Sequence, residues 1–346
     1  MDKQISGDAD LSPVSTGHLP SSAVVQTLVK DAYEQFKPNL DGEQADYYPA
    51  LARIPANLFG ICVAGINGIL YSAGDALFPF TIMSVSKPFL FALVCQALGP
   101  EQVRQKLGVN STGLPFNSIL AIELNPSRLT NPMVNTGAIA ATSLVPGESI
   151  ETKWQFIYQG LARFAGRELA LNEEVYASAS ASNQRNHVIA RLLASYDRFY
   201  DDPLEAVDLY TRQCSLDVTA TDLAVMAATL ADGGVNPITK ERVIDRVLCP
   251  PVLAVMATAG MYETSGDWLY DVGLPGKSGV GGGIITVAPG KGGLGTFSPR
   301  LDRAGNSVRG QLATQFLSTR LGLNIFASEP EIDVYRKTRS ESGEPY

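Results

Sequence analysis

The stretch FTIMSVSKPFLFALVCQAL, residues 80–98, joins a polar Ser-x-x-Lys motif to an apolar run. The apolar run predicts a buried helix that opens at the motif, Ser84 to Lys87. Residues three apart share one face of a helix, so the lysine amine can meet the serine hydroxyl. A lysine that is desolvated or held near other cations can be neutral and accept the serine proton. The stretch predicts a serine nucleophile at a helix start that faces a cleft, although the motif alone also fits an ordinary polar first turn.

A second motif borders the strand GGGIITVA, residues 281–288, near the other end of the chain. It consists of Lys277-Ser278-Gly279-Val280, a Lys-Ser-Gly-Val sequence that enters the strand. An edge strand with a turn would explain it without any chemistry. Serine β-lactamases and penicillin-binding proteins, however, pair a Ser-x-x-K nucleophile with a Lys-Thr-Gly-like strand that borders the site. The two motifs occur here in that order with helical sequence between them, and a serine replaces the threonine.

The sequence around these motifs predicts helices at both ends of the ordered chain and strands next to each. Apolar spacing predicts a first helix over Ser22–Phe36 and a last one from about Ser307 to Leu321. Asn67-Gly68 sits between two β-branched runs, which predicts a hairpin with a type I′ turn. Strands return at GGIITVAP and LGTFSP, whereas the sequence from Ser84 to about Tyr270 is predominantly helical.

These elements predict an α+β fold: an antiparallel sheet flanked by the terminal helices, plus a large helical subdomain. A lone hairpin is barely stable, so the early and late strands are expected to share one sheet. The predicted boundaries place a single catalytic domain at residues 21–328. Within it the sheet lobe covers about 21–83 and 271–325, and the helical lobe about 84–270. Residues 1–20 and 329–346 are polar and predicted to be disordered tails.

Composition excludes several classes of function. The chain has 346 residues, is 45% hydrophobic and carries a formal net charge of −8, which argues against a nucleic-acid or anionic-membrane surface. The start has no signal-peptide pattern, and no apolar run spans a bilayer. Four scattered cysteines without a CxxC fit free thiols in a cytoplasmic protein. The two histidines, His18 and His187, form no metal motif, so we expect neither a metal nor another cofactor.

Eight further segments make the sequence resemble the glutaminase family, from about Ser22 to Asn324. The long blocks NPMVNTGAI and GLPGKSGVGGG are the most specific. In chain order the segments are ADYYPAL (45–51), FNS (116–118), NPMVNTGAI (131–139), RN (185–186), YTRQCS (210–215), GMY (260–262), GLPGKSGVGGG (273–283) and GNSV (305–308).

The resemblance implies a serine-dependent amidohydrolase with a β-lactamase-like fold that converts L-glutamine to L-glutamate and ammonia. Ser84 would attack the γ-carboxamide, with Lys87 as its partner. Tyr262 and Tyr47 would line the reacting amide, and Tyr262 would relay a proton. The backbone N–H groups of Ser84 and Val280 would hold the oxyanion.

The resemblance also implies how the rest of the substrate is held and how the chains assemble. Asn135, Asn186 and Tyr210 would bind the amino-acid end of the substrate. By analogy with relatives, the enzyme would be a homodimer or homotetramer whose only partner is its small-molecule substrate.

One position departs from the family pattern. A Ser-Glu pair precedes the Arg-Asn segment in glutaminases, and its glutamate contacts the substrate's α-ammonium; here the aligned pair is Ser178-Ala179. Glu173 and Glu174, a few residues upstream, are candidate replacements if the local register shifts. Two alternatives to a glutaminase therefore stay open: an amidohydrolase of the same fold acting on another small amide, and a non-catalytic amino-acid-binding relative.

Overall fold

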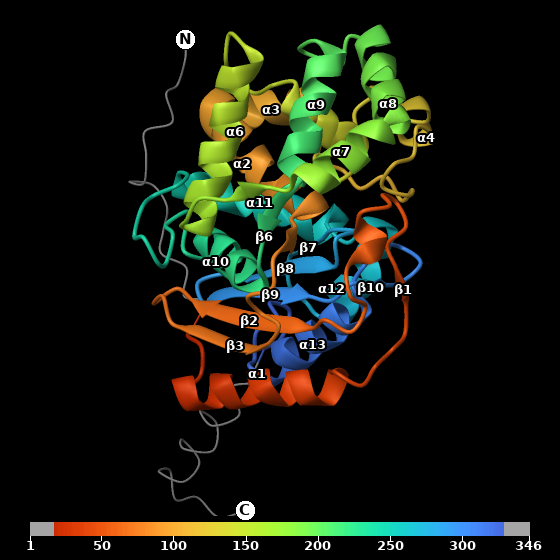
Figure 1. The fold of residues 1–346 in the computed structure, drawn as a ribbon. Coiled ribbons are helices and arrows are strands. Elements are labelled where there is room, and N and C mark those ends of the chain that lie inside the picture. The colour runs from red at the N-terminus through yellow and green to blue at the C-terminus, as the bar shows by residue number, and fades with distance from the viewer. Residues whose placement is uncertain (1–16, 329–346) are drawn as a thin grey trace, which may run out of the picture.

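The computed structural model describes residues 17–328 (Figure 1). Most of both predicted tails therefore lies outside the described residues. At its centre is a five-stranded sheet in the order β3-β2-β9-β8-β7, in which every neighbouring pair is antiparallel. The early hairpin thus joins the late strands in one sheet. Its strands are β2 (Gly60–Gly65), β3 (Leu70–Gly74), β7 (Gly276–Ser278), β8 (Gly283–Ala288) and β9 (Gly292–Phe297).

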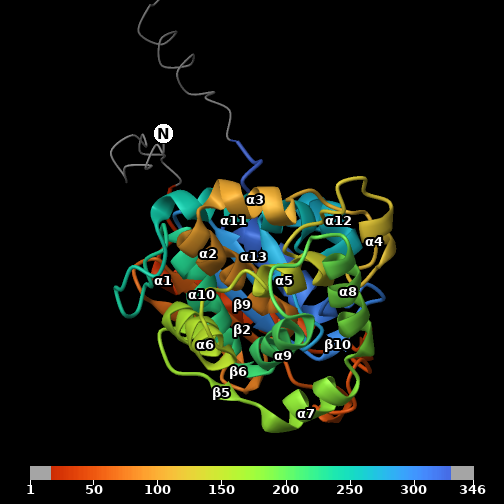
Figure 2. The same ribbon diagram turned by 90° about the horizontal axis from the view of Figure 1, so that it is seen from above.

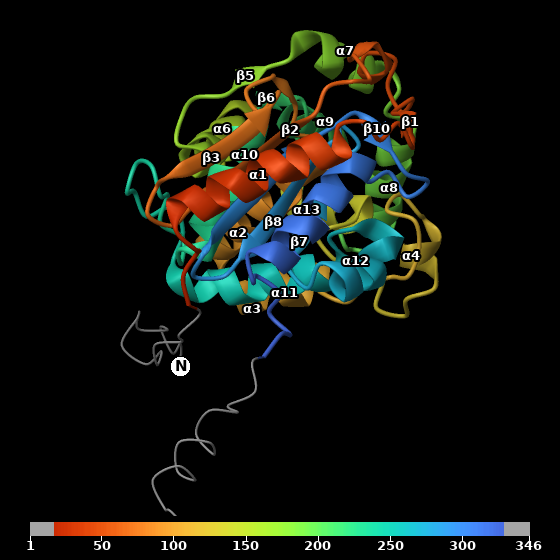
Figure 3. The same cartoon turned by 90° about the horizontal axis from the view of Figure 1, so that it is seen from below.

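Helices cover both faces of this sheet. The terminal helices α1 (Ser22–Phe36) and α13 (Val308–Arg320) lie across one face, as the view from below shows (Figure 3). On the other face α10 (Ala220–Ala231) packs against β9. A Cβ on Gly295 would stand only 2.1 Å from the carbonyl oxygen of Ala220, so glycine is required for this close approach.

A large helical region lies between β4 and β7 in sequence and stands above the sheet (Figures 1 and 2). Its helix α2 (Lys87–Leu98) follows the Ser-x-x-Lys motif and has every residue from Lys87 to Cys95 buried, which explains why its sequence is apolar all round. The other α-helices of this region are α3 (Pro100–Leu107), α4 (Leu120–Glu123), α5 (Asn135–Thr142), α6 (Ile150–Ala165), α7 (Glu173–Ala181), α8 (Gln184–Ser195), α9 (Pro203–Cys214), α11 (Cys249–Ala259) and α12 (Ser265–Asp271).

Three local features differ from the expectations. The β2–β3 turn is not type I′, because Gly68 takes a positive φ (87°) and Asn67 does not; the Asn67 side chain instead accepts from the N–H of Ile69. The Lys-Ser-Gly-Val motif does not run into one strand, since a turn at residues 279–282 separates β7 from β8. The helical region also contains strands, which form a three-stranded sheet in the order β4-β6-β5.

The members of that small sheet are β4 (Phe80–Thr81), β5 (Ala170–Leu171) and β6 (Leu216–Val218). Strands of two or three residues have no room for an alternating pattern, which is why the sequence did not reveal them. A further two-stranded sheet joins β1 (Glu43–Gln44) to β10 (Arg300–Leu301). The predicted α+β class, with an antiparallel sheet flanked by terminal helices and a large helical part, is confirmed.

No single helix within residues 17–328 combines the length and apolar composition needed to cross a membrane. One bent pair, Arg246–Ala259 with Tyr262–Asp271 at 99°, meets the requirement by length and composition only.

Candidate active site

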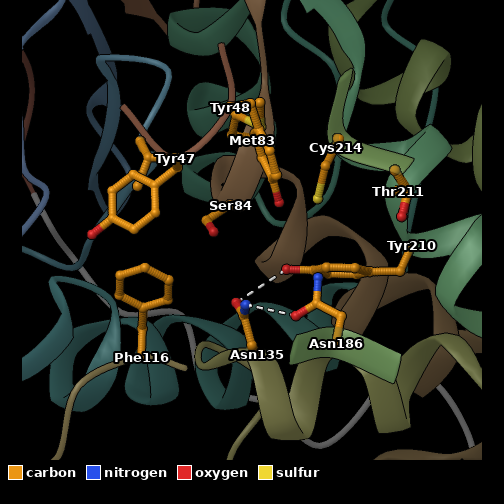
Figure 4. A pocket seen from close by; sticks show the side chains of 12 residues that line it. Tyr47, Tyr48, Met83, Ser84, Phe116, Asn135, Asn186, Tyr210, Thr211 and Cys214 are labelled. Atoms are coloured by element: carbon orange, nitrogen blue, oxygen red, sulfur yellow. Dashed lines mark hydrogen bonds between the residues drawn. The ribbon is translucent and has the colours of Figure 1, made fainter. Parts of the chain in front are cut away.

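A pocket opens where the helical region meets the turn after β7 (Figure 4). Ser84 lies between the rings of Tyr47 and Phe116 on one side and the side chains of Asn186 and Tyr210 on the other. None of the lining side chains carries a charge at neutral pH in its ordinary protonation state. They are Tyr47, Tyr48, Met83, Ser84, Phe116, Asn135, Ala179, Asn186, Tyr210, Thr211, Cys214 and Val280.

A strained turn presents Ser84 to the pocket. The residue lies in the 3₁₀ turn η2 (Met83–Ser86), one turn earlier than the α-helix that begins at Lys87. Met83, directly before it, has φ 47°, a left-handed conformation that non-glycine residues rarely adopt. Such strain persists only where the surroundings hold it, and it is concentrated at functional sites. In a 3₁₀ turn, residues three apart eclipse one another, which brings Lys87 directly over Ser84.

Lys87 is the immediate partner of Ser84. Its side chain is 2% exposed, and Nζ lies 2.5 Å from Ser84 Oγ and 3.0 Å from Asn135 Oδ1. Burial lowers the pKa of Lys87 to about 8, although the nearby Cys214 thiol acts in the opposite direction. An amine with this pKa is neutral in about a tenth of the molecules at pH 7, far more than an ordinary lysine, and the neutral form can accept a proton from the serine.

The side chains of Asn135, Asn186 and Tyr210 form one hydrogen-bonded group (Figure 4). Lys87 donates to this group through Asn135. Asn135, the first residue of α5, accepts from Lys87 and, at 3.2 Å, from the Tyr210 hydroxyl through the same oxygen. Its Nδ2 donates to Asn186 Oδ1 at 3.2 Å. Helices α5, α8 and α9 therefore bring together three residues that lie far apart in sequence, as the resemblance implied.

The site contains two backbone N–H groups that donate no hydrogen bond to any group within residues 17–328, those of Ser84 and Val280. The turn after β7 passes very close to Ser84: a Cβ on Gly279 would stand 3.3 Å from the Ser84 nitrogen and 3.1 Å from the Ile82 oxygen. Two free donors beside a serine oxygen are what an oxyanion hole requires.

Tyr262 lies next to the pocket and is not among the residues that line it. It is 5% exposed, and its ring centroid is 4.7 Å from that of Phe116, which does line the pocket. Its hydroxyl donates to the carbonyl oxygen of Ser278 at 3.1 Å. Burial raises the pKa of Tyr262. The backbone of this residue is also left-handed, with φ 57°.

A second buried lysine, Lys277, stands over the face of the Tyr262 ring, 4.3 Å from its centroid. Its Nζ donates to the carbonyl oxygens of Gly260 at 2.9 Å and Ser278 at 2.5 Å. Burial lowers the pKa of Lys277 well below its ordinary value, and the neighbouring Lys87 adds to this effect. The sequence placed Lys277 beside the site but assigned it no role.

Tyr47 forms part of the mouth of the pocket and is 42% exposed. Its ring centroid lies 5.7 Å from that of Phe116. Burial of the ring, followed by the negative charge of Asp46, raises the pKa of Tyr47.

Ala179 lines the pocket from α7 and is 3% exposed. Neither upstream glutamate takes the place of a carboxylate there. Glu173 and Glu174 are both exposed, and Glu174 is ion-paired with Arg53. The suggestion that a register shift supplies one of them is therefore wrong: both lie in the first turn of α7, which Asn172 caps, and neither lines the pocket.

Reasoning from the sequence missed several lining residues, although most lie inside the segments that resemble the family. Phe116 belongs to FNS, Tyr48 to ADYYPAL, and both Thr211 and Cys214 to YTRQCS. Asn183 was also missed; it lies behind Asn186, whose Nδ2 donates to its side-chain oxygen. Its chain position, three residues before Asn186 on a helix start, was the available signal.

Within residues 17–328, no three His, Cys, Asp or Glu side chains lie close enough together to hold a metal ion. The expectation that the site needs no metal or cofactor stays a prediction.

The fold and this site together define an amidohydrolase of the β-lactamase-like class. Residues 42–326 match a family model described as Glutaminase. Glutaminase 2 of Yersinia pestis is 65% identical over 317 residues, which cover 92% of this chain and 93% of the relative. The chain belongs to the glutaminase family, and its activity is that of a glutaminase.

Solved structures agree with this assignment. The probable glutaminase YbaS superposes with a TM-score of 0.88 at 45% identity, over 89% of this chain and all of that one (100%). Mglu, in an L-glutamate binding form, superposes with a TM-score of 0.82 at 38% identity, over 88% of this chain and 68% of its own. The predictions of the family, the fold class and the enzyme class are confirmed.

Proposed function

We propose that this chain hydrolyses L-glutamine through an acyl intermediate on Ser84, with Lys87 as the general base. The observation that carries the proposal is the 2.5 Å contact between Lys87 Nζ and Ser84 Oγ, together with a lysine pKa of about 8. The neutral amine takes the hydroxyl proton as Oγ bonds to the γ-carbonyl carbon. The carbonyl oxygen becomes negative and is held by the N–H groups of Ser84 and Val280.

Collapse of this tetrahedral species breaks the carbon–nitrogen bond and releases ammonia. The departing nitrogen needs a proton, which the Lys87 ammonium or the Tyr262 hydroxyl supplies. Burial raises the pKa of Tyr262, which keeps its proton in place for donation. A water molecule then attacks the acyl-enzyme, returns its proton through the same groups and frees L-glutamate.

The amino-acid end of the substrate is assigned to Asn135, Asn186 and Tyr210. Their amide and hydroxyl groups already converge on one side of the pocket. Mglu, a relative of known structure, is described in an L-glutamate binding form, which supports a product-sized site here. Neutral amides and a phenol can hold a carboxylate through hydrogen bonds.

Covalent labelling tests the nucleophile. A glutamine-derived electrophile is expected to add one equivalent to the wild-type chain, and peptide mapping by mass spectrometry is expected to locate it on Ser84. The matched control is Ser86→Ala, which removes a buried hydroxyl two residues away that bonds to Met83 and Gln213. It is expected to keep the label, whereas Ser84→Ala loses both the label and turnover. Labelling or near-normal turnover in Ser84→Ala would overturn the mechanism.

A second candidate function, an amidohydrolase for a substrate without an α-ammonium, is favoured by one observation. The residues lining the pocket include Ala179 and no acidic side chain. An ammonium that leaves water for such a pocket lacks a compensating carboxylate. Comparing ammonia release from L-glutamine and from its analogue without the α-amino group separates the two candidates, because only the second predicts a preference for the analogue.

We also propose that the enzyme works in the cytoplasm as a homodimer or homotetramer. All four cysteines are free, which supports a reducing compartment. Light scattering of the purified chain tests the assembly: a monomer at micromolar concentration would contradict it.

A further inference from the structure

Behind the three substrate-side residues, two more polar side chains continue the hydrogen bonds into the protein. Asn186 Nδ2 donates to Asn183 Oδ1 at 2.5 Å, and Asn183 Nδ2 donates to Thr211 Oγ1 at 2.6 Å. The Thr211 hydroxyl in turn donates to the carbonyl oxygen of Val207, one turn earlier in α9, at 2.7 Å. Asn183 and Thr211 are 5% and 4% exposed. Three asparagine amides and one hydroxyl thus form a continuous series of hydrogen bonds, which we call the amide chain: Asn135, Asn186, Asn183 and Thr211.

The amide chain has a direction, and Thr211 sets it. The Thr211 hydroxyl donates its only proton to the carbonyl oxygen of Val207, so toward Asn183 it can only accept a hydrogen bond. The Asn183 amide must then point its NH₂ at Thr211 and its oxygen at Asn186. Asn186 must in turn direct its NH₂ at the Asn183 oxygen, which leaves its own oxygen facing Asn135. Asn135 therefore directs its NH₂ at that oxygen, because each amide has one donor end and one acceptor end. The Asn135 oxygen is thereby turned toward Lys87.

This orientation matters for the proton transfer proposed above. A neutral amine has two N–H donors and one lone pair. While the Asn135 oxygen accepts an N–H from Lys87, the lone pair is available to the Ser84 hydroxyl. With the amide reversed, the Asn135 NH₂ would donate into that lone pair and compete with the serine.

We propose that Asn183 and Thr211 are positioning residues that fix the direction of the amide chain and so keep the lone pair of Lys87 directed at the Ser84 hydroxyl. This inference rests on the proposed role of Lys87 as the base. Neither residue needs to touch the reacting atoms. Their effect reaches the nucleophile through Asn186 and Asn135, over residues contributed by α5, α8 and α9.

Thr211→Val tests the proposal, because it keeps the shape of the side chain and removes the acceptor that anchors the chain. We expect kcat to fall about tenfold, the scale of one hydrogen bond, with a smaller change in KM. We also expect the acid limb of the kcat/KM profile to move to lower pH by about half a unit or more. The sign follows because a reversed amide no longer accepts from the ammonium form of Lys87, which disfavours that form.

The other titratable groups that face Lys87 stay in place in this variant. They are Tyr210, whose ring centroid lies 5.5 Å from Nζ, the Cys214 thiol and the amine of Lys277. Asn183→Leu breaks the chain one link earlier and is expected to shift the profile in the same direction. Thr211→Ser restores a hydroxyl and is expected to return both kcat and the acid limb toward wild type.

Thr229→Val is the matched control. Thr229 is also fully buried in a helix and donates to the carbonyl oxygen one turn earlier, that of Val225, but it bonds to no asparagine. Its removal should leave the pH profile unchanged. If Thr211→Val and Asn183→Leu fold normally and keep the wild-type profile, the positioning role is overturned while the Ser84 mechanism stands. If Ser84→Ala remains active, the proposed function itself fails.

Discussion

Two buried lysines lie at the candidate site around Ser84, and they differ in the type of group to which each is hydrogen-bonded. Lys87 and Lys277 are 2% and 0% exposed, and within residues 17–328 neither pairs with a carboxylate. Lys87 bonds to two side chains, the Ser84 hydroxyl and the Asn135 amide. Lys277 bonds to two backbone carbonyls, those of Gly260 and Ser278.

The difference favours Lys87 over Lys277 as the proposed base. A hydroxyl can give up its proton and an amide can reorient, so the partners of Lys87 can respond when its protonation changes. Carbonyl oxygens only accept and are fixed in the backbone. Lys277 therefore links β7 to the end of α11 through its hydrogen bond to Gly260, and it packs against one face of the Tyr262 ring. Burial of a lysine at an active site does not by itself identify the base; the nature of its partners does.

The largest expected effect comes from Lys87→Met. Loss of a general base of this kind costs about 10²–10⁴-fold in kcat, and we expect a value near the upper end because Lys87 is the only amine within reach of Ser84 Oγ in the described part of the chain. Steady-state ammonia release measures it, with thermal melting as a control for folding.

The pH profile of the wild-type enzyme also tests whether Lys87 is the base. The base must be neutral, so kcat/KM is expected to rise with pH and level off above about 8, where burial places the pKa of Lys87. An acid limb that persists unchanged in a residually active Lys87→Met variant would assign it to another group.

Tyr262→Phe comes next in size. If the hydroxyl passes a proton to the leaving ammonia, its removal should lower kcat by about 10²-fold or more with little change in fold. The ring keeps its packing against Phe116 and its contact with Lys277. An unchanged kcat with a raised KM would instead make Tyr262 a binding residue.

Lys277→Met should affect stability more than catalysis. It removes two hydrogen bonds to buried carbonyls, each of which keeps another donor, the Ser278 N–H for Gly260 and the Tyr262 hydroxyl for Ser278, so each loss costs about 0.5–1.5 kcal/mol. We expect a clear fall in melting temperature and a change in kcat of less than about tenfold. A kcat loss as large as that of Lys87→Met, in a folded protein, would break the distinction between the two lysines.

The sequence predicted that Ser84 and Lys87 would meet, because that contact depends on short-range spacing; their catalytic roles stay predictions. Ser84 and Lys87 are three residues apart and meet within one turn. It also predicted the first and last helices, whose apolar spacing is regular. The type I′ turn was wrong because the Asn67 side chain bonds locally and leaves only Gly68 left-handed.

Long-range contacts escaped prediction for a physical reason. The amide chain joins residues 135, 186, 183 and 211 across three helices, and the choice of hydrogen-bond partners depends on how those helices pack. The only local signal for Asn183 is its position three residues before Asn186 at a helix start, and that position does not reveal its bond to Thr211 on another helix. Phe116 likewise reaches Tyr47 and Tyr262 from a loop.

Ala179→Glu should produce the smallest effect on kcat, because it acts on substrate binding, and it tests how an added charge changes the pKa of Lys87. The side chain at this position faces the pocket that holds Ser84, so a carboxylate there would meet the substrate's α-ammonium. A charge-assisted hydrogen bond contributes about 1.5–3 kcal/mol, or roughly 10- to 150-fold in affinity, before the cost of burying the acid.

We therefore expect Ala179→Glu to lower KM for L-glutamine at least several-fold, with a smaller effect on the analogue that lacks the α-amino group. The added negative charge should also favour the ammonium form of Lys87 and move the acid limb of kcat/KM to higher pH, opposite to the shift expected for Thr211→Val. Ala179→Gln, which has nearly the same shape and no charge, is the control and should do neither. If KM for glutamine is unchanged or rises in Ala179→Glu, either another group already compensates the ammonium or that end of the substrate binds elsewhere in the pocket.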